Sequence, residues 1–314
     1  KRERGDGLMA NLDRASQSRG VVYDLGYRNY DGPRLGRRYA IRSLYVLSLR
    51  NTFGLGRGTL PKVLAFGLAL IALLPAIFTV AFGALAGENF KLVEHHEYFG
   101  LIQIVIVLFV AAMASDLVGN DRKNNTLPLY FSRPIERDDY LLAKIAALAT
   151  ALMSLTLLPQ LLVFVGNWLG ATDGTEWLGD NISDIWRIGA SSTLVSLQLA
   201  VIGLAIAMFT TRRAFALTSV LAALWFSVVF TGFLVTVLGP GWAAVAMLAT
   251  PGYAMNAATY VIFDAVPARA DRMGEMADQV AYADLPGWTW IAALVAQTAI
   301  ALFFAIRRYR KVTL

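Results

Sequence analysis

The chain has 314 residues, of which 57% are hydrophobic and only 16% charged, and its mean hydropathy is +0.54. This composition excludes an ordinary soluble domain and predicts a protein embedded in a bilayer. The absence of cysteine excludes a disulfide framework and a cysteine metal site, and the net charge of +6 does not by itself indicate nucleic acid, because the distribution of charge matters more.

The beginning of the chain is polar. Residues 1–20 are charged without apolar periodicity, which predicts a flexible tail. Residues 21–38 mix tyrosines with glycines and are either an extended clamp on a partner or the inner leaflet, or a solvated basic linker. Residues 39–53 carry an apolar stripe beside arginines, which predicts a helix lying along the headgroups. Gly54, Gly56 and Gly58 then indicate a joint rather than a phosphate cradle, because no strand precedes them.

Six apolar stretches contain no Asp, Glu, Lys or Arg. They cover residues 63–86, 99–115, 145–166, 188–210, 214–239 and 288–306. A hydrocarbon core about 30 Å thick needs about 20 helical residues, and one charge at its centre costs roughly 2.5–3.5 kcal/mol. The sequence therefore predicts six transmembrane helices, of which the second is short and is expected to begin nearer Glu97.

The distribution of charge sets the orientation of these spans. With six spans, all but four of the 28 Lys and Arg fall on the same side as both termini, whereas more than half of the 22 acidic residues fall on the other side. The four exceptions are Lys91, Arg187, Arg269 and Arg272. Because positive residues concentrate on the inner side of a membrane, both termini are predicted to be cytoplasmic.

A further apolar run, residues 242–266, is interrupted by Pro251-Gly252. A seventh full crossing would place the basic C-terminal residues outside. We therefore expect residues 239–266 to form two half-helices that dip into the outer leaflet and return between the fifth and sixth spans. The expected fold is an all-α polytopic membrane protein, with residues 1–61 as cytoplasmic tail and interfacial helix and residues 62–314 as the six-span domain.

One polar segment, residues 116–144, separates two long apolar runs on the cytoplasmic side. The second span is expected to end near Asp116, and Pro134 is expected to start the next helix, whose first turn carries three carboxylates favoured by its dipole. Between them lies a short amphipathic stretch with Leu127, Leu129, Tyr130 and Phe131. The pattern predicts a compact knob that exchanges force with a soluble partner.

The order of residues in this segment is Asp121, Thr126-Leu127, Ser132-Arg133-Pro134-Ile135, Arg137, Tyr140 and Lys144. It resembles the first cytoplasmic loop of ABC-2 type ABC transporter permeases, a family that often has an acidic residue and Gly where this chain has Asn124-Asn125. In that family the loop carries the coupling helix that docks into the ATPase subunit. The resemblance also implies that residues 39–53 are an elbow helix and that residues 239–266 are a re-entrant hairpin near the outer gate.

Two groups of functional residues follow from the resemblance. The expected ATPase-coupling residues are Asp121, Arg122, Asn125, Thr126, Leu127, Leu129, Tyr130, Ser132, Arg133, Pro134 and Arg137. The expected outer-gate residues are Pro251, Gly252, Tyr253 and Asn256. No catalytic, cofactor-binding or metal-binding residue is expected on this chain, and because its sequence contains no P-loop, ATP and Mg²⁺ are expected on the partner ATPase.

Other polar residues have competing explanations. Glu94-His95-His96-Glu97 contains metal-ligand types, but adjacent histidines point apart, so a polar loop that caps the second span is favoured. Polar residues within the spans either line a translocation route or form helix-to-helix hydrogen bonds worth about 1 kcal/mol. They are Gln103, Gln160, Gln198, Gln297, Ser191, Ser192, Ser196, Ser227 and Thr231.

These observations predict the permease subunit of an ATP-driven ABC-2 type exporter in the cell membrane. Its expected partners are an ABC ATPase subunit, a second copy of the permease and membrane lipids, with no nucleic acid. Export is favoured over import because no docking loop for a binding protein is evident. Two alternatives stay open: an ion-coupled carrier, disfavoured because the spans hold no acidic ion ligands, and a membrane anchor or sensor that recruits a soluble partner.

Overall fold

A computed structural model describes residues 32, 35–86, 93–123, 126–132, 134–210, 212–237, 240–265 and 285–310. The chain divides into two units, Lys1–Leu35 and Gly36–Leu314, and every helix of the described residues belongs to the second unit. The predictions of a tail over residues 1–20 and of a clamp or linker starting at residue 21 fall almost entirely outside the described residues.

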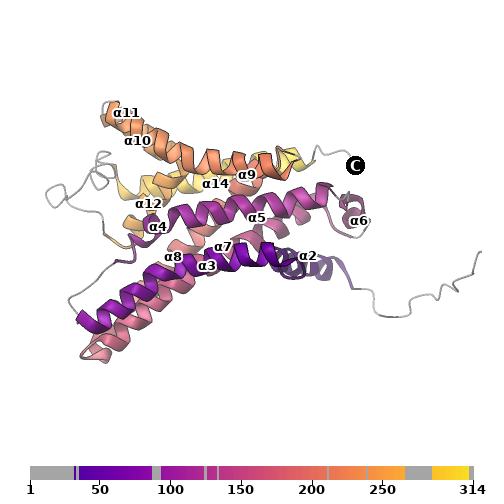
Figure 1. Cartoon of the computed structure of the whole chain (residues 1–314). Helices are drawn as coiled ribbons and strands as arrows, with labels where there is room; N and C mark the ends of the chain where they lie inside the picture. The colour runs from indigo at the N-terminus through magenta and orange to yellow at the C-terminus, as the bar shows by residue number, and fades with distance from the viewer. Residues whose placement is uncertain are drawn as a thin grey trace, which may run out of the picture. The chain divides into compact units, whose positions relative to one another are not determined.

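The described part of the chain is built from helices (Figure 1). In chain order they are α2 (Arg37–Thr52), α3 (Thr59–Ala86), α4 (Tyr98–Leu101), α5 (Gln103–Lys123), α6 (Leu127–Phe131), α7 (Arg137–Gly170), α8 (Gly174–Ala207), α9 (Arg213–Leu221), the π-helical turn η1 (Ala222–Phe226), α10 (Ser227–Val237), α11 (Pro240–Ala249), α12 (Pro251–Ile262) and α14 (Gly287–Arg310). The predicted all-α class is confirmed for these residues.

Five helical stretches in the described residues are long and apolar enough to cross a membrane. They are Thr59–Leu85, Arg137–Gly170, Gly174–Ala207, Arg213–Leu234 and Gly287–Arg310. They correspond to the first, third, fourth, fifth and sixth predicted spans. The apolar stretch Gln103–Gly119 of α5 is shorter, so the second span stays a prediction.

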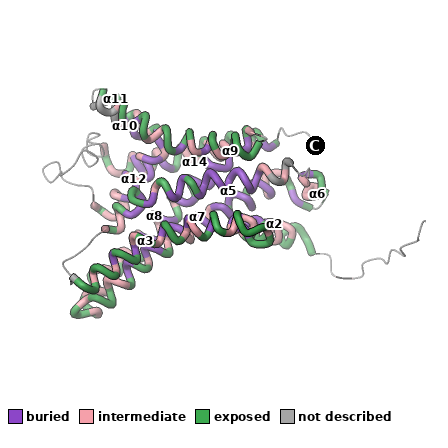
Figure 2. The backbone as a smooth tube through the Cα atoms, in the orientation of Figure 1, coloured by how far each residue is buried: buried purple, intermediate pink, exposed green. Residues whose placement is uncertain are grey.

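α5 lies in the middle of the bundle, and Figure 2 shows it buried along most of its length. It packs against α3, α7, α8 and α9. The approach of α5 to α8 is close, because a Cβ at Gly203 would overlap the side chain of Val110. Small residues permit such close packing where water provides no driving force between helices.

α5 continues to Lys123, so the prediction that this helix ends near Asp116 is wrong. The helix extends past its apolar part because the carboxylates of Asp116 and Asp121 are paired with cations of other elements of the bundle. At the start of α5, the short helix α4 precedes it, and a break at Ile102 separates the two helices. With α4 included, the apolar segment begins at Tyr98.

α7 and α8 are much longer than the predicted spans, with 34 residues each. At 1.5 Å per residue, each measures about 51 Å and exceeds a hydrocarbon core of about 30 Å. They are joined through Asp173, whose side chain accepts hydrogen bonds from the amides of Thr175 and Glu176 and so caps α8. Residues 174–187, expected in the loop before the fourth span, therefore continue that helix.

Residues 239–266 contain two short helices, as predicted. α11 ends at Ala249, Thr250 is extended (φ −94°, ψ 120°), and Pro251 starts α12. Proline at the first helical position ends the preceding helix and begins the next. That these two helices enter and leave one leaflet stays a prediction. The interfacial position of α2 and the cytoplasmic location of the termini also stay predictions.

Candidate functional site

The short helix α6 folds back beside the end of α5. The amide and the hydroxyl group of Thr126 both bond to the carbonyl of Asp121, at 3.1 and 3.2 Å, and so reverse the chain. Leu127 then points into the protein and is 8% exposed, whereas Leu129 is 68% exposed. The ring of Tyr130 packs 5.5 Å from that of Tyr140 on α7. α6 thus has one face fixed on the bundle and one apolar residue directed outward.

Asp121, Tyr140 and Lys144 form a buried polar cluster beneath α6. The Lys144 ammonium group lies 2.6 Å from Asp121 Oδ2 and donates to the carbonyl of Leu117 at 2.9 Å, and its side chain is only 3% exposed. The Tyr140 hydroxyl group donates to the same carboxylate oxygen, and its ring stacks on Tyr309 of α14 at 5.2 Å. One carboxylate therefore holds α5 to α7, and the stacked rings add α14.

Another carboxylate, that of Asp116, is buried and pairs with two arginines. Arg57, from the connection between α2 and α3, lies 3.3 Å from Oδ2, and Arg213, at the start of α9, lies 2.5 Å from Oδ1. Asp116 itself is 4% exposed. A charge removed from water is stable only when it is compensated, so this carboxylate fixes two further elements to α5.

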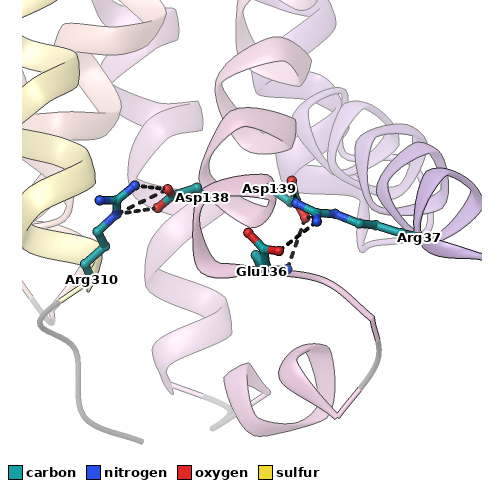
Figure 3. A network of polar contacts seen from close by, with 5 residues as sticks. All are labelled: Arg37, Glu136, Asp138, Asp139 and Arg310. Atoms are coloured by element: carbon teal, nitrogen blue, oxygen red, sulfur yellow. Dashed lines mark hydrogen bonds and ion pairs between the residues drawn. The ribbon is translucent and has the colours of Figure 1, made fainter.

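The N-cap position and the first turn of α7 carry the three carboxylates expected from the sequence (Figure 3). Glu136 and Asp139 make a capping box, which satisfies amides that the helix leaves free. Arg37 of α2 bonds both of these side chains, at 2.7 Å to Glu136 and 2.8 Å to Asp139. Arg310 of α14 pairs with Asp138 (Figure 3).

Most residues of the predicted coupling group do gather here. Asp121, Thr126, Leu127, Leu129, Tyr130, Ser132, Pro134 and Arg137 lie on α6, at the end of α5 or at the start of α7. Arg137 donates to the carbonyl of Arg310 at 2.6 Å. Asn125 and Arg133 fall outside the described residues, as does the side chain of Arg122.

Sequence reasoning missed the two arginines that hold Asp116. A usable signal existed, because Arg57 and Arg213 flank the first and fifth spans on the side on which Asp116 ends the apolar run of the second. One carboxylate and two guanidinium groups at the same membrane depth could have been paired on that ground. No comparable signal pointed to Arg37 and Arg310, which pair with the carboxylates at the start of α7. Both arginines are exposed, so their pairing does not follow from the need to compensate a buried charge.

The predicted outer-gate residues lie in the first half of α12. A Cβ at Gly252 would overlap Val228 and lie 2.6 Å from Gln103 Nε2, so α12 packs tightly there against η1–α10 and α5. Among the described residues, the buried Oδ1 atom of Asn256 has no hydrogen-bond partner. Their role in gating stays a prediction.

Several polar residues of the spans join helices. Gln198 on α8 donates to Gln297 on α14 at 2.8 Å, and Gln297 donates to the carbonyl of Leu248 near the end of α11 at 2.6 Å. The hydroxyl groups of Thr231 and Thr250 lie 2.5 Å apart. For these residues the hydrogen-bonding explanation applies, and they fix the α11–α12 break to α8, α10 and α14.

Comparison with known proteins gives one family. The family model described as "ABC-2 family transporter protein" matches residues 40–314, which is most of the chain. A search of curated proteins finds no match. The match includes every helix from the second turn of α2 to α14. The chain therefore belongs to the ABC-2 transporter family, as a multi-pass membrane permease component of an ABC transporter.

Proposed function

We propose that this chain is the permease subunit of an ATP-driven exporter of the cell membrane, coupled to a separate ATPase subunit through α6. ATP and Mg²⁺ bind to the ATPase, and a second copy of the permease completes the translocation pathway. The α6 end of the bundle and both termini face the cytoplasm. Export is proposed because the sequence shows no docking loop for a binding protein.

The observation that carries this proposal is the two-faced character of α6. Leu129 is 68% exposed on a helix whose other face, with Leu127 at 8%, is packed into the bundle. An exposed leucine on a fixed helix can enter an apolar groove of a partner, and full burial contributes about 1.5–3 kcal/mol.

Transmission from α6 to the spans is supported by its contacts. A displacement of α6 acts on Tyr140 through the rings of Tyr130 and Phe131, which lie 5.5 and 6.2 Å away. Tyr140 and Asp121 join α7 to α5, so these two helices are expected to tilt together. Because α5 also packs against α12, the tilt reaches the proposed outer gate at Gly252.

The test is to co-purify the chain with its ATPase subunit and to measure complex formation and ATP turnover. Leu129→Asp is expected to weaken the complex about tenfold or more, because an apolar anchor is replaced by a charge. Leu55→Asp is the control, since Leu55 is also exposed, at 40%, but lies outside α6. Leu127 is unsuitable as a docking probe, because it is buried and its substitution disturbs folding.

Wild-type affinity and turnover in Leu129→Asp, with a folded protein, would contradict docking through α6. Equal losses in Leu129→Asp and Leu55→Asp would assign the effect to the added charge instead.

A further inference from the structure

A polar cavity lies at the end of the bundle opposite α6. Its volume is about 160 Å³, and the residues of its wall that carry charge or an aromatic ring include Glu94, His96, Trp177, Asp184, Arg187 and Phe263. They come from the segment before α4, from α8 and from the end of α12. Four elements meet there, because Val163 and Asn167 of α7 complete the wall.

The local structure explains why these side chains converge. Trp177, Asp184 and the intervening Asn181 are spaced by three and four residues, so they lie on one face of α8. The long extension of α8 beyond the predicted span provides this face. Phe263 follows the last turn of α12, and its ring stacks on His95 at 5.9 Å.

The wall carries more negative than positive charge. Arg187 pairs with Asp184 at 3.2 Å, so these two charges offset each other. Glu94 lies 3.4 Å from His96 Nδ1. Burial lowers the pKa of His96, although Glu94 and Glu97 act in the opposite direction, so the imidazole is neutral near pH 7. Within the part of the chain that the structure describes, the Glu94 carboxylate then faces no full positive charge in an ion pair.

The aromatic walls suit the same kind of ligand. Trp177 is held by Phe164, with ring centroids 5.2 Å apart, and Phe263 is held by His95. Indole and phenyl faces attract organic cations when the cation lies within about 6 Å of the ring. A group of three or more His, Asp or Glu side chains placed to hold a metal ion is absent from the described residues, which argues against a metal.

We infer that this cavity binds a small organic cation with an ammonium group, held by Glu94 against the rings of Trp177 and Phe263. The volume sets the size, since a cavity of about 150 Å³ accepts a molecule as large as benzene. The ammonium group can belong to a free amine or to the headgroup of a lipid. This site is independent of α6 and of the proposed ATPase coupling.

The experiment uses the full chain purified in detergent, with tetramethylammonium chloride as the probe and sodium chloride at equal ionic strength as the reference. Calorimetry and thermal denaturation measure binding. We expect saturable binding and a higher melting temperature with tetramethylammonium only. Equal effects of the two salts would overturn the inference.

Two carboxamide variants locate the site. Glu94→Gln is expected to weaken binding about tenfold or more, because a charge that faces the cation is lost. Asp184→Asn is expected to weaken binding less, because the charge of Asp184 is already paired with Arg187. Asp180→Asn is the matched control, since Asp180 is an exposed carboxylate on the same helix outside the cavity. Glu94 has a half-exposed side chain and is not required for packing, so Glu94→Gln remains decisive even if Asp184→Asn fails to fold. Wild-type affinity in Glu94→Gln would overturn the inference.

The source of the ammonium group is distinguished in lipid nanodiscs. If the lipid headgroup is the ligand, phosphatidylethanolamine weakens tetramethylammonium binding relative to pure phosphatidylglycerol, and Glu94→Gln removes this difference. If the ligand is a free amine, the affinity is the same in both lipids. If the probe binds in neither lipid, the result would count against the site itself.

Discussion

The two ends of the helix bundle are held together differently. At the α6 end, Asp121 and Asp116 are each paired with cations from other elements, and aromatic rings stack around Tyr140. At the opposite end, helices are interrupted at Ile102 and Thr250, and a cavity remains open.

This difference supports the roles proposed above for the two ends. A network of compensated charges resists distortion, because moving one partner leaves another charge buried and unpaired. Interrupted helices and open space permit repacking at lower cost. An end that receives force benefits from the first arrangement, and an end that opens or binds a ligand benefits from the second.

The strongest test of the comparison removes the carboxylate beneath α6. Asp121→Ala leaves the ammonium group of Lys144 buried at 3% exposure without a counter-charge, and we expect a loss of about 3–5 kcal/mol in the free energy of unfolding. Denaturant titration in mixed micelles measures it. The double variant Asp121→Asn/Lys144→Met is the control and should lose much less, since no charge is stranded. A fully stable Asp121→Ala protein would contradict the conclusion that compensated charges hold the α6 end together.

Asp116 should be the next most sensitive position. Asp116→Asn keeps the shape of the side chain but removes the charge that Arg57 and Arg213 face. Because the arginine side chains are 24% and 54% exposed, water screens part of the interaction, and the expected loss is about 1–2 kcal/mol. The same titration gives the value, with the exposed Asp180→Asn as reference. A loss larger than that of Asp121→Ala would reverse the assigned order of the two carboxylates.

At the opposite half of the bundle, Gln297 offers a smaller but more local effect. Gln297→Leu removes its bonds to Gln198 and to the carbonyl of Leu248, for an expected loss of about 1 kcal/mol. The α11–α12 break should loosen as a result.

A thiol reporter measures that loosening, since the chain contains no cysteine. Met247→Cys places one at a fully buried position of α11, and its labelling should accelerate in Gln297→Leu. Thr298→Val is the control, because among the described residues the Thr298 hydroxyl group bonds only to the carbonyl of Leu294, within its own helix. Equal labelling in both variants would show that the glutamine bonds do not hold the break.

The smallest expected effect is a pH dependence from His96. Burial lowers its pKa below the ordinary value of 6.5, so the unfolded chain binds a proton more readily than the folded protein. Stability is therefore fully present above about pH 6.5 and falls as the pH drops through the lower, folded-state pKa. His96→Gln should flatten this part of a plot of melting temperature against pH. An unchanged slope in His96→Gln would place the pH dependence elsewhere.

Several elements could be predicted because they depend on short-range chemistry. Five of the six apolar stretches match candidate spans, since a bilayer crossing requires a continuous apolar run. The α11–α12 break follows from Pro251, and the capped start of α7 follows from Glu136 and Asp139. Each of these features is encoded by neighbours within a few residues.

The end of α5 could not be predicted in this way. Taken alone, Asp116 and the residues after it look like the start of a loop. Their helical state depends on Arg57, Lys144 and Arg213, which other elements bring into place. Long-range ion pairs of this kind have no local signature, and the same holds for Arg37 and Arg310 at the first turn of α7.

By itself, then, the sequence determined that this is a helical membrane protein, roughly where its spans lie, and which segment resembles a coupling loop, because apolar run length, charge distribution and turn residues act locally. Only the tertiary structure decided which face of α6 is free, which carboxylates are buried with cations, and that Glu94, Trp177 and Asp184 share one cavity wall. Those outcomes depend on how helices distant in sequence pack together, and burial is what turns an ordinary charged side chain into a strong interaction.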